Sequence, residues 1–273
     1  MTEQNFETDQ ETQEAVAIAE EQQPVRGIQS RWLKPRFFLL LFLGLGFLGF
    51  LYLWQGHFRR PVSLMMPGEV ALRPLIKVEF KESSFFQEWK EHLFSKKTVY
   101  TIETVENNEK VLHAVSHGAS SVLFKQVNVG LSERPFLTWE WKAIRFPSNK
   151  KNEALAAKSD NDFAARVYVA FRGRNPFLSD VIEYVWDDHF PEGTFVSSPY
   201  LGSTKIFVIQ NTGTNPAEKW IAEKRDIVRD YQKLFGRLPR GNVSAIGVMS
   251  DSDNTGTEAE AYYRRLSIQK PVS

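Results

Sequence analysis

Short runs of strand-forming residues recur every ten to fifteen positions from Leu75 onward, and this rhythm constrains the fold most strongly. The runs are rich in β-branched and aromatic side chains and are bounded by Asn, Gly, Pro or Ser. They cover residues 75–80, 98–105, 110–116, 121–129, 136–144, 163–171, 181–186, 205–210, 243–250 and 260–268. Only the stretches 83–94 and 225–236 have helical character. Strands without a βαβ rhythm predict a mainly β antiparallel sandwich or barrel. We expect a jelly-roll-like β-sandwich with one or two short helices.

The segment before these strands has the charge pattern of a membrane anchor. Residues 1–23 carry seven acidic and no basic side chains and are expected to be disordered. Four basic residues, the last of them Arg36, precede the uncharged run FFLLLFLGLGFLGFLYLW at 37–54. A helix of this length spans roughly 27 Å, just enough to cross the hydrocarbon core of a bilayer. The following QGHFRRPV has no small-residue cleavage site, so we expect an uncleaved transmembrane helix.

The predicted anchor divides the chain into four parts. Residues 1–36 form an acidic tail with a basic flank, 37–54 the anchor, 55–73 a linker, and 74–270 the β-sandwich domain. The excess of Lys and Arg before the anchor predicts a cytoplasmic N-terminus and a β domain outside the membrane. The inner-membrane bilayer is thus an expected partner. A net charge of +1 gives no indication of a nucleic-acid partner, and the absence of cysteine excludes disulfides.

The densest polar cluster follows the ninth predicted strand. Asp251, Asp253 and Thr255 occupy positions 1, 3 and 5 of a calcium loop, with a glycine at position 6. An EF-hand needs Glu at position 12, where Tyr262 stands, and flanking helices rather than strands. Three interpretations remain: a calcium site of another kind, a hydrogen-bonded turn, and the rim of a ligand site that also includes Asn254. No cofactor other than calcium is indicated.

Alternation within 163–171 predicts a second candidate site in the middle of a sheet. The apolar odd-numbered positions face inward, so Arg166 and Tyr168 project from the opposite face. Glu183, in the next run, can pair with Arg166. The pair is either a solvated cross-strand ion pair or a charged floor in a concave sheet face. Together with Trp186, these residues are ligand-binding candidates.

Two tryptophans alternate in the run TWEWK. Trp139 and Trp141 share one face of the strand, because side chains two positions apart point the same way. Tryptophan rings also stack on sugars, but two on one face of a half-polar strand are typical of a core. We predict that both are packed inward.

No motif of an established catalytic class is present. The patterns GxSxG, HExxH and GxGxxG and the phosphate-binding P-loop are all missing. A paired-carboxylate enzyme would need acidic residues from distant runs to meet in space; Asp160, Asp162 and Asp187 are further candidates for such a pair.

Several segments together resemble a bacterial family catalogued as domain of unknown function 3047. They are KTVYTIE, LHAVSHGASSVLFKQV, PFLTWEWKA, NDFAARVYVAF, IEYVW, EKRDIVRDYQKLFG and AIGVMSDSDNTGTEAEAYY, in this order across roughly residues 75–268. The resemblance implies an extracytoplasmic, usually exported β-rich domain and carries no activity or functional residues. Members usually have an ordinary signal sequence, so the acidic tail and uncleaved anchor depart from the pattern.

These observations together predict a single-pass protein of the bacterial inner membrane, with a cytoplasmic N-terminus and a periplasmic domain. We expect the domain to recognise a glycan or another envelope component rather than to catalyse a reaction. A carbohydrate-active enzyme that uses paired carboxylates and a purely structural envelope protein are the alternatives.

Overall fold

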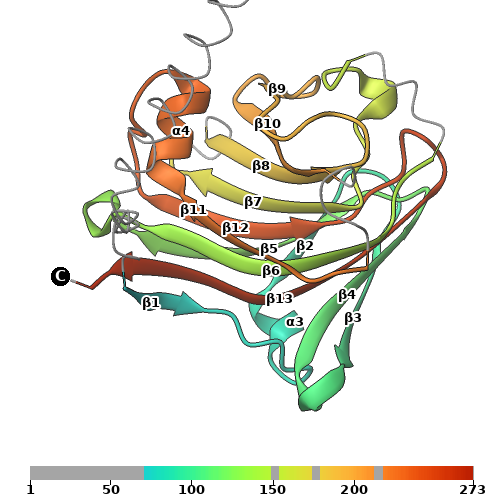
Figure 1. Ribbon diagram of the computed structural model, residues 1–273, viewed down its shortest axis with the longest axis horizontal. Helices are drawn as coiled ribbons and strands as arrows, with labels where there is room; N and C mark the ends of the chain where they lie inside the picture. The colour runs from blue at the N-terminus through green and yellow to red at the C-terminus, as the bar shows by residue number, and fades with distance from the viewer. Residues whose placement is uncertain (1–70, 149–153, 174–178, 212–217, 273) are drawn as a thin grey trace, which may run out of the picture. The chain divides into compact units, whose positions relative to one another are not determined.

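The computed structural model describes residues 71–148, 154–173, 179–211 and 218–272. The predicted tail and anchor, and most of the linker, lie outside these ranges. Within the described residues, no helix is both long and apolar enough to cross a bilayer. The described chain is mainly β, as the recurring runs predict, and its strands form two sheets packed face to face (Figure 1).

The first sheet is built around the longest strand and has the order β11-β6-β13-β4-β3, with β1 also pairing with β13. Its members are β1 (Leu72–Lys77), β3 (Val99–Thr104), β4 (Lys110–His117), β6 (Phe136–Arg145), β11 (Ile221–Asp226) and β13 (Glu258–Pro271). All of their pairings are antiparallel. Residues at opposite ends of the domain sequence, in β1 and β13, are therefore neighbours.

The second sheet has the order β2-β5-β12-β7-β8-β10-β9. Its members are β2 (Lys90–Leu93), β5 (Ser121–Val129), β7 (Ala165–Phe171), β8 (Asp180–Asp187), β9 (Phe195–Ser197), β10 (Thr204–Asn211) and β12 (Val243–Met249). One pair, β8 and β10, is parallel, which corrects the expectation of a purely antiparallel sheet. The segment 188–203 makes this possible, because a parallel pair needs a crossover of about a dozen residues or more.

One of the two predicted helices is complete and the other is not. Helix α4 (Ile227–Phe235) begins at Asp226, whose carboxylate accepts the Arg229 N–H at 3.0 Å, and ends at Gly236 in the left-handed conformation, φ +67°. The prediction of a helix over 83–94 is wrong in its second half. Only α3 (Phe85–Glu88) is helical there, and the following residues form β2. A helix this short is marginal in water, whereas the same residues pair with β5 as a strand.

Within the described part of the chain, three short 3₁₀ turns connect strands. They are η1 (Glu106–Asn108), η2 (Leu131–Glu133) and η3 (Lys158–Asp160). The last of them lies in the connection between β6 and β7.

The core between the sheets is aromatic. Trp139 and Trp141 of β6 are 2 % and 0 % exposed, which confirms that they pack inward. Trp139 contacts Tyr184 with ring centroids 5.5 Å apart, and Trp141 contacts Trp186 at 5.7 Å, so the two sheets interlock through these rings. A second, smaller apolar cluster covers part of the other face of the second sheet; it consists of Leu155, Phe163, Val185, Ile206 and Val208.

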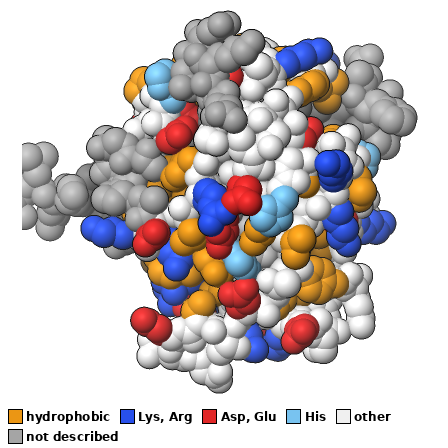
Figure 2. Space-filling model, turned by 90° about the vertical axis from the view of Figure 1, so that its right-hand side faces the viewer, with side chains coloured by type: hydrophobic (Ala, Val, Ile, Leu, Met, Phe, Trp, Pro, Cys, Tyr) orange, Lys and Arg blue, Asp and Glu red, His pale blue; other side chains and the backbone are white. Residues whose placement is uncertain are grey.

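Charged side chains on the surface are largely paired with one another. On the face shown in Figure 2, acidic, basic and histidine side chains are interleaved with hydrophobic ones. Paired charges are also frequent on the first sheet. Arg264 binds Glu109 at 2.8 Å and Glu140 at 2.6 Å.

Candidate functional site

A cavity of about 540 Å³ lies on the face of the second sheet that points away from the first. Strands β5, β12, β7 and β8 form its floor, because alternate residues of these strands turn outward. In β7, Val167 and Val169 belong to the core, whereas Arg166 and Tyr168 line the cavity. The alternation in the sequence predicts this division, and the structure confirms it.

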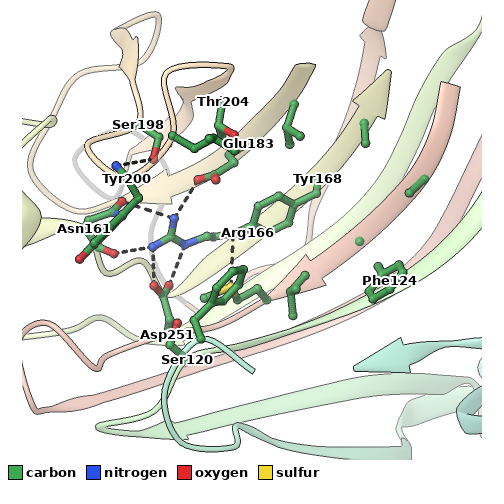
Figure 3. A pocket seen from close by; sticks show the side chains of 18 of the residues that line it. Ser120, Phe124, Asn161, Arg166, Tyr168, Glu183, Ser198, Tyr200, Thr204 and Asp251 are labelled. Carbon is green, nitrogen blue, oxygen red and sulfur yellow. Dashed lines mark hydrogen bonds and ion pairs between the residues drawn. The ribbon is translucent and has the colours of Figure 1, made fainter. Parts of the chain in front are cut away.

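Arg166 is the centre of the polar end of the cavity (Figure 3). Its Nε donates to Asp251 Oδ1 at 2.7 Å, and its Nη1 donates to Glu183 Oε2 at 2.9 Å and to Asn161 Oδ1 at 3.4 Å. Its Nη2 donates to the Asn161 carbonyl and to Asp251 Oδ2. The guanidinium also lies 4.5 Å from the ring of Phe163. A guanidinium has five N–H donors, so every donor of Arg166 is used within the protein.

This geometry resolves the two interpretations of the Arg166–Glu183 pair. Arg166 is 2 % exposed and Glu183 is 8 % exposed, so the pair is buried rather than solvated. Because Arg166 has no donor left over, its role is to hold the two carboxylates in place. Among the charged groups of the cavity, those that remain to meet a ligand are therefore carboxylates, whose oxygens accept hydrogen bonds.

Negative charge is in excess at this end of the cavity. One oxygen from each of Asp162, Asp251 and Asp253 lies within 4.8 Å of the others, and Glu183 adds a fourth carboxyl group beside the single guanidinium. Burial, together with the neighbouring Asp162, raises the pKa of Asp251 to about 7 although Arg166 lowers it. Burial also raises the pKa of Glu183 and of Asp253. The electrostatics therefore disfavour a further anion here.

The loop that contains the predicted calcium ligands is held by hydrogen bonds. Asp162 Oδ2 accepts the backbone N–H of Thr255 at 2.7 Å, and Asp162 Oδ1 accepts that of Asn254 at 3.2 Å and its side-chain amide at 2.9 Å. Thr255 Oγ1 bonds to Thr257 Oγ1 at 2.9 Å and does not belong to the acidic cluster. A cation would have the carboxylates of Asp162, Asp251 and Asp253 available, but both oxygens of Asp251 already accept from Arg166.

The other end of the floor is apolar. Cross-strand register places Phe124, Gly247, Tyr168 and Glu183 side by side across four strands. The next row, farther from Arg166, consists of Ala245, Ala170, Val181 and Thr204. Most of this row offers no hydrogen-bonding side chain. The polarity of the cavity thus changes along the strand direction.

Partly exposed aromatic and aliphatic side chains form the rim. Tyr200 is 56 % exposed and Leu201 is 50 % exposed, and both lie in the connection before β10. Phe94, 61 % exposed, approaches from the segment after β2. The Tyr200 hydroxyl donates to Asn254 Oδ1, which links the rim to the loop after β12.

The structure brings six of the seven predicted ligand-binding residues to this cavity: Arg166, Tyr168, Glu183, Asp251, Asp253 and Asn254. The prediction that Trp186 binds the ligand is wrong. It is 0 % exposed and packs against Trp141 on the core side of β8, so it does not line the cavity. Sequence reasoning missed Asn161, Phe124 and Tyr200. Only Phe124 carried a usable signal, because it is an apolar residue on the face of β5 that points away from the core.

Comparisons with known proteins place the chain in a family without supplying a ligand. No curated protein matches it. Among solved structures, the family 11 carbohydrate-binding module of the cellulosomal cellulase Lic26A-Cel5E of Clostridium thermocellum has 9 % identity and a TM-score of 0.38, covering 74 % of this chain and 96 % of the module. The K1 cleaved adhesin domain of Lys-gingipain from Porphyromonas gingivalis W83 has 8 % identity and a TM-score of 0.33, covering 74 % and 99 %. An exo-β-agarase has 10 % identity and a TM-score of 0.37, covering 74 % and 25 %. Likeness at this level carries no inference about ligands.

The family match is of a different kind, because it rests on sequence. The family described as "Protein of unknown function (DUF3047)" matches residues 87–267. This range runs from α3 through most of β13 and includes every residue of the cavity described above. The chain therefore belongs to the DUF3047 family.

Proposed function

We propose that the jelly-roll-like domain is a recognition module that binds a neutral glycan in the cavity of the second sheet. The observation that carries this proposal is the combination of fixed carboxylate acceptors at one end of the cavity with aromatic side chains along its floor and rim. Sugars present both kinds of surface: hydroxyls that donate to carboxylates and C–H faces that pack on rings. A concave site with a few convergent polar groups among apolar ones is the usual form of a small-molecule site.

The charge of the site narrows the ligand class. Arg166 has no spare donor: it binds the carboxylates of Asp251 and Glu183, and Asp162 and Asp253 lie close to Asp251. A phosphate, sulfate or carboxylate on the ligand would meet these groups without a matching cation. A hydroxyl can donate to Glu183 or Asp253 instead, and such charge-assisted hydrogen bonds are the stronger kind. Neutral, hydroxyl-rich saccharides fit these requirements.

The proposed location follows from the sequence. The uncharged run at 37–54 and the basic residues before it support a single anchor in the bacterial inner membrane, with the N-terminus in the cytoplasm. The linker at 55–73 would then tether the domain on the periplasmic side, where envelope glycans are within reach.

A second candidate is a glycoside hydrolase, and the raised pKa of Asp251 favours it. A carboxyl group that keeps its proton up to about pH 7 can act as a general acid. In this structure, however, Asp251 accepts from Arg166 and from the Phe163 N–H at 3.1 Å. Release of reducing sugar from the glycans that bind would establish hydrolysis. Binding without release would exclude it for those glycans.

The proposal can be tested at Met249, which lies in the cavity floor. The chain has only four methionines, so ¹³C-methyl labelling of the full chain in phosphatidylcholine nanodiscs gives a small set of signals, of which Met249 reports on the cavity. We expect neutral oligosaccharides from bacterial envelopes to shift this signal. Glu183→Gln should weaken binding by about tenfold, the value of one charge-assisted hydrogen bond.

Glu140→Gln is the matched control, because Glu140 is also an ion-paired glutamate in the middle of a strand, but on the first sheet. It should bind as the wild type does. If no neutral saccharide moves the Met249 signal, or if both variants weaken binding equally, the proposal is overturned.

A further inference from the structure

We propose that the saccharide ligand carries an alkyl or acyl chain, and that this chain lies on the apolar half of the cavity floor. This inference rests on the proposed function and names the ligand class more narrowly. It follows from the change of polarity along the strands, which the recognition of a sugar alone does not require.

The floor changes from charged to apolar over a short distance. Arg166, Tyr168 and Ala170 are successive outward positions of β7, and four residues of a strand span about 13 Å. At the Arg166 end, four charged groups line the cavity: Arg166, Glu183, Asp251 and Asp253. At the Ala170 end, the adjacent positions on β12 and β8 are Ala245 and Val181. A ligand that fills the cavity must therefore be polar at one end and apolar at the other.

The apolar half is also hollowed by small side chains. Ala170 and Ala245 are cross-strand partners, and Gly247 lies one outward position farther along β12. A Cβ at Gly247 would lie 3.0 Å from the Leu123 carbonyl oxygen and 3.3 Å from a methyl group of Val122, so a side chain here would fit only if these neighbours moved by a few tenths of an ångström. These residues leave a trough between the larger side chains of Phe124 and Tyr168.

The trough is partly open to solvent. Phe124, Ala170, Val181 and Ala245 are all half-buried rather than buried. Apolar surface that stays in contact with water in a concave site is stabilised by an apolar ligand group. A second sugar ring would leave its hydroxyls without partners over Ala170, Ala245 and Val181, because these side chains have no polar atoms. An aliphatic chain has no such groups to satisfy.

The test compares the binding of matched pairs of probes to the full-length protein in nanodiscs. The methyl signal of Met249 reports the binding. The probes are methyl and n-butyl β-glycosides of glucose, galactose, mannose and N-acetylglucosamine, with n-butanol as the chain alone and empty nanodiscs as the reference. Each fully buried methylene contributes about 0.8 kcal/mol, a factor of about 4 in Kd. We expect a butyl glycoside to bind at least about tenfold more tightly than its methyl partner.

Substitutions in the trough show where the alkyl chain of the ligand binds. Ala170→Leu fills the trough and should remove the preference for butyl over methyl. Ala245→Leu provides the same test from the neighbouring strand. Ala222→Leu, an exposed position on β11 of the first sheet, is the matched control and should keep the preference.

The outcomes separate the two proposals. Equal affinity for methyl and butyl glycosides would contradict the proposed alkyl or acyl chain of the ligand. The proposal of glycan recognition would remain. A butyl preference that persists in both trough variants would also overturn the assignment of the chain to this half of the floor. If n-butanol moves the signal of Met249 while no methyl glycoside does, the proposed glycan function fails and the apolar site remains.

Discussion

Arg166 is a side chain whose whole hydrogen-bonding capacity is spent inside the protein. It holds Asp251 of the loop after β12, Glu183 of β8 and the Asn161 segment before β7. Three segments that are distant in sequence are therefore tied at one point. A buried ion pair contributes little over an apolar replacement, but removing one partner from it is costly.

The first prediction is that Arg166→Lys destabilises the domain by about 3–5 kcal/mol. A lysine has a single ammonium group and cannot reach all of the acceptors that the planar guanidinium serves. Chemical denaturation of the full chain would measure the loss. The exposed Arg229 of α4 offers the control, and Arg229→Lys should change the stability by less than about 0.5 kcal/mol. Equal effects of the two substitutions would contradict the role assigned to Arg166.

The second prediction concerns Glu223 of β11, which accepts a hydrogen bond from Gln210 at the edge of the core. Burial raises its pKa from 4.5 to about 7. Between these two values the folded state holds more protons than the unfolded state, so the free energy of unfolding falls as the pH rises and the loss is complete above pH 7. Glu223→Gln should remove this decline and stabilise the protein at pH 8 by on the order of 1–3 kcal/mol.

Urea unfolding of wild type and variant at pH 5 and pH 8 would measure the effect of Glu223. Glu106→Gln, at an exposed position of η1, controls for the loss of one charge. A variant that loses stability equally at both pH values would show that Glu223 is ionised throughout this range.

The third prediction separates core from site on β8. Trp186→Ala should destabilise the domain by about 3–5 kcal/mol, as Trp139→Ala should, because both rings fill the space between the sheets. Thermal or urea unfolding would measure both. A Trp186→Ala variant that is fully stable but no longer binds a glycan would return Trp186 to the ligand site.

At the scale of the elements, the strands were predictable where alternation runs through a long segment. β5 matches its predicted range fully, and β4, β6 and β10 match theirs to within one residue at each end. The short strands β2, β9 and β11 carry no such pattern, because they are short edge strands whose pairing partners decide their form. The parallel β8–β10 pair was not predictable either, since the direction of a strand depends on its connection and not on its own residues.

The candidate site shows the same limit. The alternation of β8 puts Glu183 and Trp186 on opposite faces, because the two positions differ by an odd number, and the sequence alone contains that argument. The meeting of Arg166 with Asp251 could not be derived in this way. The two residues lie in different strands and loops, and only the order of strands in the sheet brings them together.

The fourth prediction concerns the loop between β12 and β13. Asp162 accepts three hydrogen bonds from this loop, so Asp162→Ala should lower the stability by about 1–3 kcal/mol. Asp253→Ala should cost less, because the bond that Asp253 accepts from Asn254 in the same loop is longer, at 3.3 Å. Added calcium should leave the unfolding temperature unchanged. A rise with calcium that Asp253→Ala abolishes would instead establish a cation site.

At the scale of the whole molecule, the fifth prediction is the topology. If residues 37–54 anchor the chain with the N-terminus in the cytoplasm, protease added to spheroplasts should degrade residues 75–273 and spare the N-terminal tail. Immunoblots with tags at each end would follow both parts. A protected C-terminal domain would reverse the orientation. A soluble domain released without protease would show that the apolar segment is cleaved.

The position of β13 has a consequence for the order in which the domain is completed. All seven strands of the second sheet precede Ser250 in the chain, whereas the first sheet has β13 at its centre, between β4 and β6. A growing chain that has emerged only as far as β12 has every strand of the cavity-bearing sheet. In the first sheet it can form the pairs β11–β6 and β3–β4, but no strand joins these two pairs and β1 has no partner. The Tyr263 hydroxyl then links the two sheets. It donates to the Met249 carbonyl at 2.6 Å and accepts the backbone N–H of Arg166 at 3.1 Å. The domain therefore stays open along one side until late in synthesis, when a single segment locks both layers.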